Sequence, residues 1–501
     1  MRTVTPPWLF EGITLYLRST MRHVPRLVAL LAVVAATLIS PAGPANAAAP
    51  SSASASAVSP TWGTYQAVAP NRVLDTRVGK GAPMAPIMSG GTVNLSVLGT
   101  AGVPDSGVSA VVLNLTITGA TKPGYLTVYP AGSIRPTASS INFVAGTDRA
   151  NMVTAPLGTL GTGAGVIAIY NPIGSVQVIA DIMGYYLADG ATTAGGFYQD
   201  TGAQRMMDTR DPAFGAPLAL APGKAVSVPV NYSDPFVDGN PHVRALAVNI
   251  TAVSPTRAGF LAAWDGGSVR PTTSTVNFAA GTDTANMAIV PVGPCLSCGA
   301  STGLPSITVI NGSSGMVNVI VDVVGFYDDG QVVDTTGIPL DGMRFKPLTP
   351  TRIVDTRLRQ GTTTFTGTSS KKVFVPASVV GPDTYMLVTN TTAVLPTMSA
   401  YLTLWADWGF GSPMPTVSNL NAPKGSIVAN ATVTDLAPTF DANFNTIGNE
   451  FSIYNSRGTT NVAVDVMGTM EYPMPPLLLA LRSTAVAPRV WKSRAIAGPV
   501  R

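Results

Sequence analysis

Short runs of alternating apolar and polar residues recur along the chain between positions 62 and 472. Examples are Val111–Thr118 (VVLNLTIT) and Val176–Tyr186 (VQVIADIMGYY), and Gly, Pro or Asn residues bound most such runs. Alternation with a period of two puts apolar side chains on one face of a strand, and turn residues mark the strand ends. The pattern predicts antiparallel sheets with one buried and one solvated face.

Five motifs recur three times in the same order, so the chain contains an internal repeat. Each copy has an RxxDTR segment, a strand with a central asparagine, an aromatic strand, a segment ending in Ala-Asn, and a closing strand with a central aspartate. A unit of about 130 residues is long enough to bury its own core. Two packed sheets would cover the apolar faces and leave few edges. We therefore predict an all-β protein of three tandem β-sandwich, jelly-roll-like domains, with a barrel as the alternative.

The motif positions set the expected domain boundaries. The repeats are expected at 62–190, 196–330 and 343–472, with an Ala/Ser-rich linker at 48–61 and a second linker at 331–342.

Both ends of the chain differ from the repeats. Residues 1–47 have the pattern of a signal peptide: Arg22 and Arg26 precede an apolar stretch, and Ala45-Asn46-Ala47 is a small-x-small cleavage site. Met21 stands directly before the basic residues and is the expected true start. The tail, 473–501, has basic but no acidic residues, and we expect it to be disordered. The chain is thus predicted to be secreted or extracellular and associated with the cell surface.

The repeats resemble a tandem β-repeat that is common in secreted and cell-surface proteins of actinobacteria. The resemblance rests on the RxxDTR, LNxT, GYLTVxP, NFxxGxxxAN and VxDVxGYY segments and covers residues 62–472. In that family the module occurs alone in tandem or appended to secreted hydrolases. The resemblance therefore implies a surface or accessory role without an activity of its own. The third copy departs from the pattern, because Met414 replaces the arginine found at Arg135 and Arg270.

Composition excludes several functional classes. The 50 glycines and 42 prolines argue against long helices. Two histidines, His23 and His242, leave no basis for a His-rich metal site or a His-centred triad, so no cofactor or metal is expected. The net charge of +4 comes from the two ends, so nucleic acid is not an expected partner. After residue 47 no apolar run reaches 18 residues, so no transmembrane span is expected.

The closing strands place three aspartates inside apolar runs, where a carboxylate needs a partner. Arginine is the expected partner because it binds carboxylates through two parallel hydrogen bonds. We predict one structural charge network in each repeat, and a ligand site formed by the same charges is the alternative. The network residues are Arg72, Asp75, Arg77, Asp181, Arg205, Asp208, Arg210, Asp322, Arg352, Asp355, Arg357 and Asp465.

Three asparagines, Asn114, Asn249 and Asn390, stand in N-x-T sequons but lie on predicted strands. We expect their side chains to bond the backbone of a neighbouring loop and not to be glycosylated. A second set, spaced nine residues apart in each copy, is expected to hold the turn between its members. That set is Asn142 and Asn151, Asn277 and Asn286, and Asn421 and Asn430.

The aromatic strands carry the candidate ligand-binding residues. Strand residues at even spacing share a face, so these aromatics form either part of the core or a platform for sugar rings. The candidates are Tyr125, Tyr129, Phe260, Trp264, Tyr401 and Trp405. Cys295 and Cys298 lie in an insertion of the second copy, and outside the cell a local disulfide is expected.

These observations predict a secreted, non-catalytic cell-surface protein that binds glycan or a cell-wall polymer through its repeats. A purely structural or adhesive stalk is the first alternative. The second is a glycoside hydrolase that uses a pair of aspartates. Three identical active sites in tandem would be unusual, so no enzymatic activity is expected.

Overall fold

The computed structural model describes residues 63–472, except 160, 192–193, 215–217, 409–412 and 442–445. The predicted signal peptide, the 48–61 linker and the basic tail lie outside the described residues. The regular elements described are strands and four short 3-10 turns, Gly161–Gly163, Pro212–Phe214, Asn240–His242 and Gly299–Ser301. None of the described residues belongs to a helix with the length and apolarity that crossing a membrane requires.

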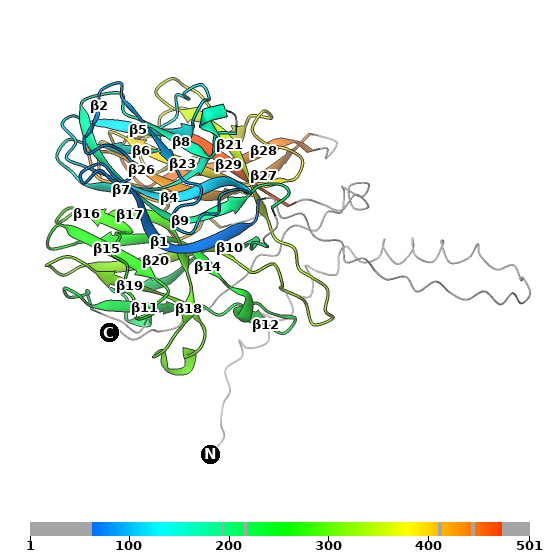
Figure 1. The fold of residues 1–501 in the computed structure, drawn as a ribbon. Helices are drawn as coiled ribbons and strands as arrows, with labels where there is room; N and C mark the ends of the chain where they lie inside the picture. Colours follow the sequence, from blue (N-terminus) through cyan, green and yellow to red (C-terminus); the bar gives the residue numbers. More distant parts are fainter. Residues whose placement is uncertain are drawn as a thin grey trace, which may run out of the picture. The chain divides into compact units, whose positions relative to one another are not determined.

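Equivalent strands occur in each of the three repeats (Figure 1). The first repeat contains β1 (Tyr65–Asp75), β2 (Ile87–Met88), β3 (Thr92–Ser96), β4 (Val108–Thr118), β5 (Gly124–Pro130), β6 (Ile141–Phe143), β7 (Arg149–Pro156), β8 (Val166–Tyr170) and β9 (Ser175–Leu187). The second contains β10 (Tyr198–Asp208), β11 (Ala225–Pro229), β12 (Ser233–Asp234), β13 (Val237–Asp238), β14 (Ala245–Val253), β15 (Gly259–Trp264), β16 (Val276–Phe278), β17 (Thr284–Pro291), β18 (Gly293–Pro294), β19 (Pro305–Asn311) and β20 (Asn318–Tyr327). The third contains β21 (Arg344–Asp355), β22 (Ser369–Val375), β23 (Thr384–Val394), β24 (Ala400–Trp405), β25 (Leu420–Ala422), β26 (Ile427–Asp435), β27 (Ala437–Phe440), β28 (Thr446–Asn455) and β29 (Asn461–Glu471).

Each repeat builds two antiparallel sheets with the same strand order. The first sheets are β1-β9-β4-β7, β10-β20-β14-β17 and β21-β29-β23-β26. The second sheets are β3-β8-β5-β6, β11-β19-β15-β16 and β22-β28-β24-β25. Short strands β2, β18 and β27 extend individual sheets, and β12 and β13 form a separate hairpin.

The six main sheets are arranged as the blades of a β-propeller. One edge strand of every sheet lies at the centre, and contacts between these strands follow the order β7, β6, β26, β25, β17, β16 and back to β7. Strands β7, β17 and β26 also contact one another. The prediction of an all-β chain is therefore confirmed.

The prediction of three tandem sandwiches is wrong, because the first sheet of each repeat is buried on both faces. On β4, Leu113 and Leu115 pack into the core of the first repeat. Ala110 and Val112 point the other way and join a core that contains residues of all three repeats. The alternating small and polar residues on this strand suggested a solvated face, but a neighbouring repeat covers it.

The sequon asparagines connect each repeat to another one, and the three connections close a ring. The amide Nδ2 of Asn114 donates to the Ser274 carbonyl at 2.6 Å, which joins the first repeat to the second. Asn249 donates to the Ser418 carbonyl at 2.8 Å, joining the second to the third. The equivalent bond from the third repeat to the first, Asn390 to Ser139, measures 2.6 Å. The side chains thus bond a neighbouring loop, as predicted, and that loop belongs to a different repeat.

A second asparagine of each repeat completes this network at the centre. Asn286 donates to the Asn114 side chain at 2.9 Å and to the Thr275 carbonyl at 2.6 Å. Its own Oδ1 accepts from the Met152 backbone N–H at 3.0 Å. Asn151 and Asn430 make the corresponding bonds in the other two positions.

Replacing one central asparagine should destabilise the whole domain. Asn286→Ala leaves a buried amide, a side-chain carbonyl and a backbone carbonyl without partners, and each such group costs about 1–3 kcal/mol. We expect the free energy of unfolding to fall by about 3 kcal/mol or more, measured by urea denaturation. Asn94→Ala, at an exposed strand position, is the control and should change it by less than about 0.5 kcal/mol. Equal effects of the two substitutions would contradict a central role for Asn286.

Candidate functional site: the clefts between repeats

A chain of alternating arginines and aspartates lies at the RxxDTR segment of each repeat. In the third repeat Arg352 on β21 stands opposite Asp465 on β29, next to a shift in the strand register. Arg352 donates to Asp465 through Nε and Nη2, both at 2.8 Å, and its Nη1 lies 3.3 Å from Asp355. Arg357 donates to both carboxylate oxygens of Asp355, at 2.8 and 2.6 Å. The register shift aims Arg352 at both carboxylates, a common use of strand irregularities next to sites.

The other two repeats contain the same network, with closest approaches of 2.7–3.6 Å. The pairs are Arg72–Asp181, Arg72–Asp75, Arg77–Asp75, Arg205–Asp322, Arg205–Asp208 and Arg210–Asp208. In each repeat, the structure thus brings together all four residues that the sequence assigns to the network.

The two carboxylates of a network have different electrostatic environments. Hydrogen bonds from Arg357 lower the pKa of Asp355, and Arg77 lowers the pKa of Asp75 in the same way. Burial raises the pKa of Asp322, and the bonds from Arg205 offset only part of this effect. The aspartate of the RxxDTR motif therefore stays ionised and holds the second arginine of the motif in place.

A cleft between the third and first repeats opens beside the third network. Its cavity of about 330 Å³ is lined by Arg352 and Arg357 from the third repeat and by Tyr125, Ser139 and Asn142 from the first. The Ser139 backbone N–H donates to Asp465 at 3.0 Å, so the same carboxylate ties the two repeats together.

An equivalent cleft lies between the second and third repeats. Its cavity of about 560 Å³ is lined by Arg205, Arg210 and Asp283 from the second repeat and by Tyr401 and Asn421 from the third, among others. Arg457, an exposed residue, also lines it. Both clefts combine the two arginines of one repeat with the first aromatic residue and the equivalent asparagine, Asn142 or Asn421, of the next repeat.

The six candidate aromatics divide into two groups. The first aromatic of each strand is partly accessible: Tyr125 and Phe260 are half-buried, and the Tyr401 residue is 38% exposed. At the second position, Tyr129 and Trp264 are buried against small apolar clusters on their own sheets, and Trp405 is half-buried. The structure therefore places Tyr125 and Tyr401 in clefts, whereas Tyr129 and Trp264 are packing residues.

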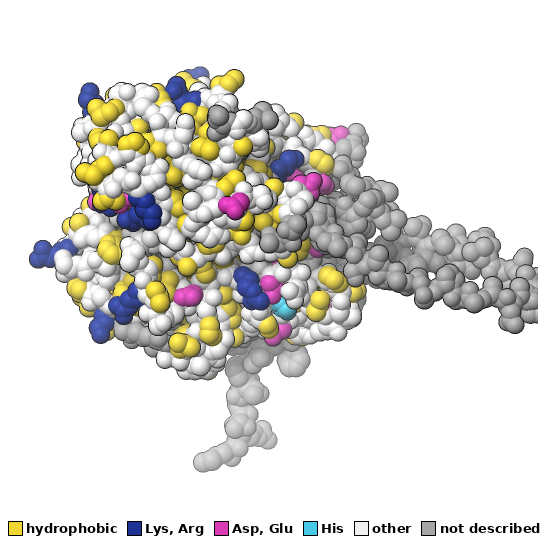
Figure 2. All heavy atoms as spheres, in the orientation of Figure 1, with side chains coloured by type: hydrophobic (Ala, Val, Ile, Leu, Met, Phe, Trp, Pro, Cys, Tyr) yellow, Lys and Arg dark blue, Asp and Glu magenta, His cyan; other side chains and the backbone are white. Residues whose placement is uncertain are grey.

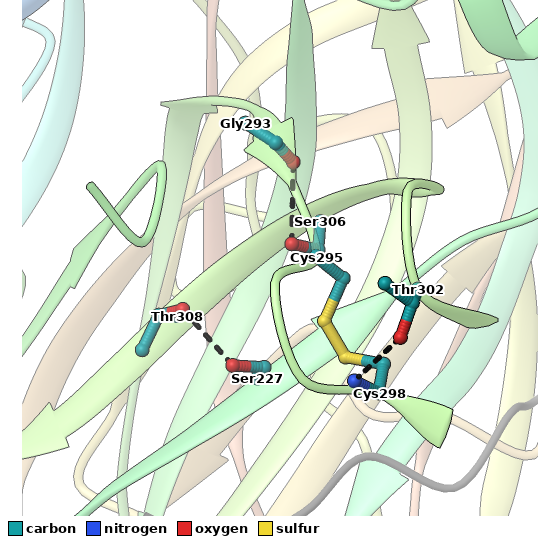
Figure 3. The surroundings of a disulfide bond; sticks show 7 residues. All are labelled: Ser227, Gly293, Cys295, Cys298, Thr302, Ser306 and Thr308. Atoms are coloured by element: carbon teal, nitrogen blue, oxygen red, sulfur yellow. Dashed lines mark hydrogen bonds between the residues drawn. A yellow bond between two sulfur atoms is a disulfide. The ribbon is translucent and has the colours of Figure 1, made fainter. Parts of the chain in front are cut away.

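The cysteines and His242 lie away from these clefts. Cys295 and Cys298 form a disulfide in the loop before β19, next to Thr302 and Ser306 (Figure 3). Nδ1 of His242 lies 3.0 Å from a carboxylate oxygen of Asp329.

Sequence reasoning missed several residues of the clefts. The sequence pattern predicts no site role for Asp283 or Ser139, although both lie in the segment that ends in Ala-Asn and recurs in every repeat. From the sequence, Asn142 and Asn421 are expected only to hold turns. Their recurrence marked them as candidates, but only the packing of one repeat on another places them beside the arginines.

Comparison with known proteins does not assign the chain to a family. No protein-family model matches the sequence, and no match is found among curated proteins. The clefts and the charge networks therefore carry the functional inference.

Proposed function

We propose that this chain is a secreted, non-catalytic cell-surface protein that binds glycan or a cell-wall polymer in the clefts between its repeats. The observation that carries the proposal is the accessible Tyr401 ring, which shares a cavity with Arg210 and Asn421. An aromatic ring offers an apolar face with few rotatable bonds. Guanidinium and amide groups supply hydrogen-bond donors and an acceptor for hydroxyl groups.

The surroundings of the clefts support a sugar polymer over nucleic acid as the ligand. Charged residues make up 11% of the chain. On the face shown in Figure 2, basic and acidic side chains lie in small groups among uncharged atoms. The charges in the clefts are thus local features, and the repetition of the cleft suits a polymer that presents the same unit many times.

Two other functions receive less support. A glycosidase needs two carboxyl groups that reach the substrate, about 5–9 Å apart. Asp355 and Asp465 are almost completely buried, and their carboxylate oxygens accept hydrogen bonds from arginines. A purely structural stalk would not need an accessible tyrosine inside each cleft.

Removing the Tyr401 ring should weaken glycan binding without unfolding the protein. We expect Tyr401→Ala to reduce retention on cell-wall polysaccharide at least threefold, because a stacked aromatic contact contributes about 1 kcal/mol or more. The melting temperature should change little, since the ring is 38% exposed. Pull-down and thermal melting on the same preparation provide the two measurements.

The control is Phe236→Ala, because the Phe236 side chain is 68% exposed on the β12–β13 hairpin. Phe236 does not line either cleft, so its removal should leave retention unchanged. If the unmodified protein retains no polysaccharide at all, the glycan proposal fails and the stalk becomes the better explanation.

A further inference from the structure

The two clefts differ in the charged residues that line them. Arg457 lines only the second of these two clefts, and a further difference in charge falls at one equivalent position of the repeats. The third residue before the central asparagine is Asp148 in the first repeat, Asp283 in the second and Ile427 in the third. Asp283 lines the cleft between the second and third repeats together with Arg210. Ile427 takes this place in the cleft between the third and first repeats, beside Arg357.

The guanidinium of Arg357 has one carboxylate partner at hydrogen-bond distance, as does that of Arg210 in the second repeat, so the exchange removes a nearby negative charge and not a hydrogen bond. Arg357 donates Nε and Nη2 to Asp355, and its Nη1 has no hydrogen-bond partner among the described residues. Its side chain is 47% exposed, whereas that of Asp355 is 2% exposed. The arginine side chain is therefore accessible, whereas the carboxylate that it bonds is not.

In the second repeat, the negative charge of Asp283 acts on Arg210. The pKa of Arg210 is raised chiefly by its hydrogen bond to Asp208, and the negative charge of Asp283 contributes to the same shift. The carboxylate of Asp283 also accepts a hydrogen bond from the Ser254 backbone at 2.8 Å. By contrast, among the described residues, no acidic side chain lines the cleft between the third and first repeats, where Arg357 lies.

We infer that the cleft between the third and first repeats binds an anionic sugar, and that Ile427 determines this preference. The inference rests on the proposed glycan-binding function and specifies its ligand class. A carboxylate or phosphate group on the polymer would accept hydrogen bonds from Nη1 of Arg357, an interaction that guanidinium groups form strongly. Tyr125 offers a ring for the sugar, and Asn142 offers an amide to its hydroxyl groups. In the second cleft, Asp283 would repel the same anion from Arg210, although Arg457 adds a positive charge to that cleft.

The test is calorimetric titration of the full chain with three probes: a galacturonate oligomer, its methyl ester and a glycerol phosphate oligomer. The methyl ester keeps the sugar and removes its charge. We expect at least one anionic probe to bind about tenfold more tightly than the methyl ester. Galacturonate binding would identify carboxylate as the anion, and glycerol phosphate binding would identify phosphate; either result supports the inference.

The decisive variant is Ile427→Asp, which copies the residue present in the other two repeats. An acid beside Arg357 should weaken binding of the anionic probe about tenfold, because a nearby like charge opposes the ligand, and should leave methyl ester binding unchanged. Ile427→Asn is the control for polarity without charge and should retain the preference. In the second cleft, Asp283→Asn keeps a hydrogen-bond acceptor, and it should add a second anion site to the stoichiometry.

The outcomes separate this inference from the proposed function. If neutral glycans bind and Ile427→Asp leaves the anionic probes unaffected, the anion preference is overturned while the glycan function stands. If neither charged nor neutral glycans bind the folded protein, both fail. Melting curves of each variant show whether a loss of binding reflects loss of the fold.

Discussion

A fragment that contains only the second repeat, residues 196–330, is expected not to fold as a stable monomer. Its Tyr198 and Tyr327 rings belong to a core shared with the first and third repeats. In the intact chain the Tyr327 ring contacts Tyr65 and Tyr186 of the first repeat, with ring centroids 4.4 and 6.2 Å away. The fragment would expose this apolar surface to water, at a cost of about 25 cal/mol per Å².

The fragment would also lose the hydrogen bonds that join the repeats. Asn249 would lose the Ser418 carbonyl, and Asn286 would lose both Asn114 and the Met152 backbone. Circular dichroism and analytical ultracentrifugation should show an unfolded or self-associated fragment, whereas residues 60–472 should melt cooperatively as a monomer. A monomeric fragment with its own cooperative transition would show that the shared core is dispensable.

Removing the buried aspartate of the third network should cost about 3–5 kcal/mol of unfolding free energy, because Arg352 loses its two shortest carboxylate bonds and keeps only the longer contact with Asp355. Asp465 has no exposed side-chain surface and accepts two hydrogen bonds from Arg352. It also accepts the Ser139 backbone N–H from the first repeat. Asp465→Ala therefore breaks a charge pair and a junction between repeats in one step.

Urea denaturation of Asp465→Ala and of Asp189→Ala tests this expectation. Asp189 is exposed and, within the described part of the chain, its side chain bonds only the Gly190 backbone N–H. Its removal should therefore change stability by less than about 0.5 kcal/mol. A loss below about 1 kcal/mol for Asp465→Ala would mean that the carboxylate is not needed to balance Arg352. The network would then be a better candidate for a ligand site than for a structural element.

The sequence is sufficient to predict the features that depend on the local pattern of residues. Alternation and turn residues indicated the strands, and recurrence of the motifs indicated equivalent sheets in each repeat. Burial energetics indicated that Asp181 needs a partner, and Arg72 is that partner at 2.9 Å. The predicted interaction of Asn114 with a neighbouring loop also follows from local chemistry. The side-chain amide of an asparagine within an apolar strand needs a hydrogen-bond partner.

Other features depend on which sheet faces are covered by a neighbouring repeat. Strand β4 carries Asn114 and Thr116 on one face, and such residues occur both on solvated faces and in interfaces between sheets. Periodicity therefore could not distinguish a sandwich from a propeller blade. The same ambiguity applied to the aromatics, because Tyr125 and Tyr129 have the same periodicity but only Tyr125 lies in a cleft.

The amino-acid sequence by itself determined the β-structure, the threefold repetition and the pairing of charges, because each depends on residues within one repeat. Only the tertiary structure decided that Asn286 meets Asn114 and that Arg357 faces Tyr125 across a cleft. Those contacts join positions more than 100 residues apart in different repeats. Their formation depends on closing three repeats around one centre, which buries the second face of each first sheet and leaves the clefts at the junctions.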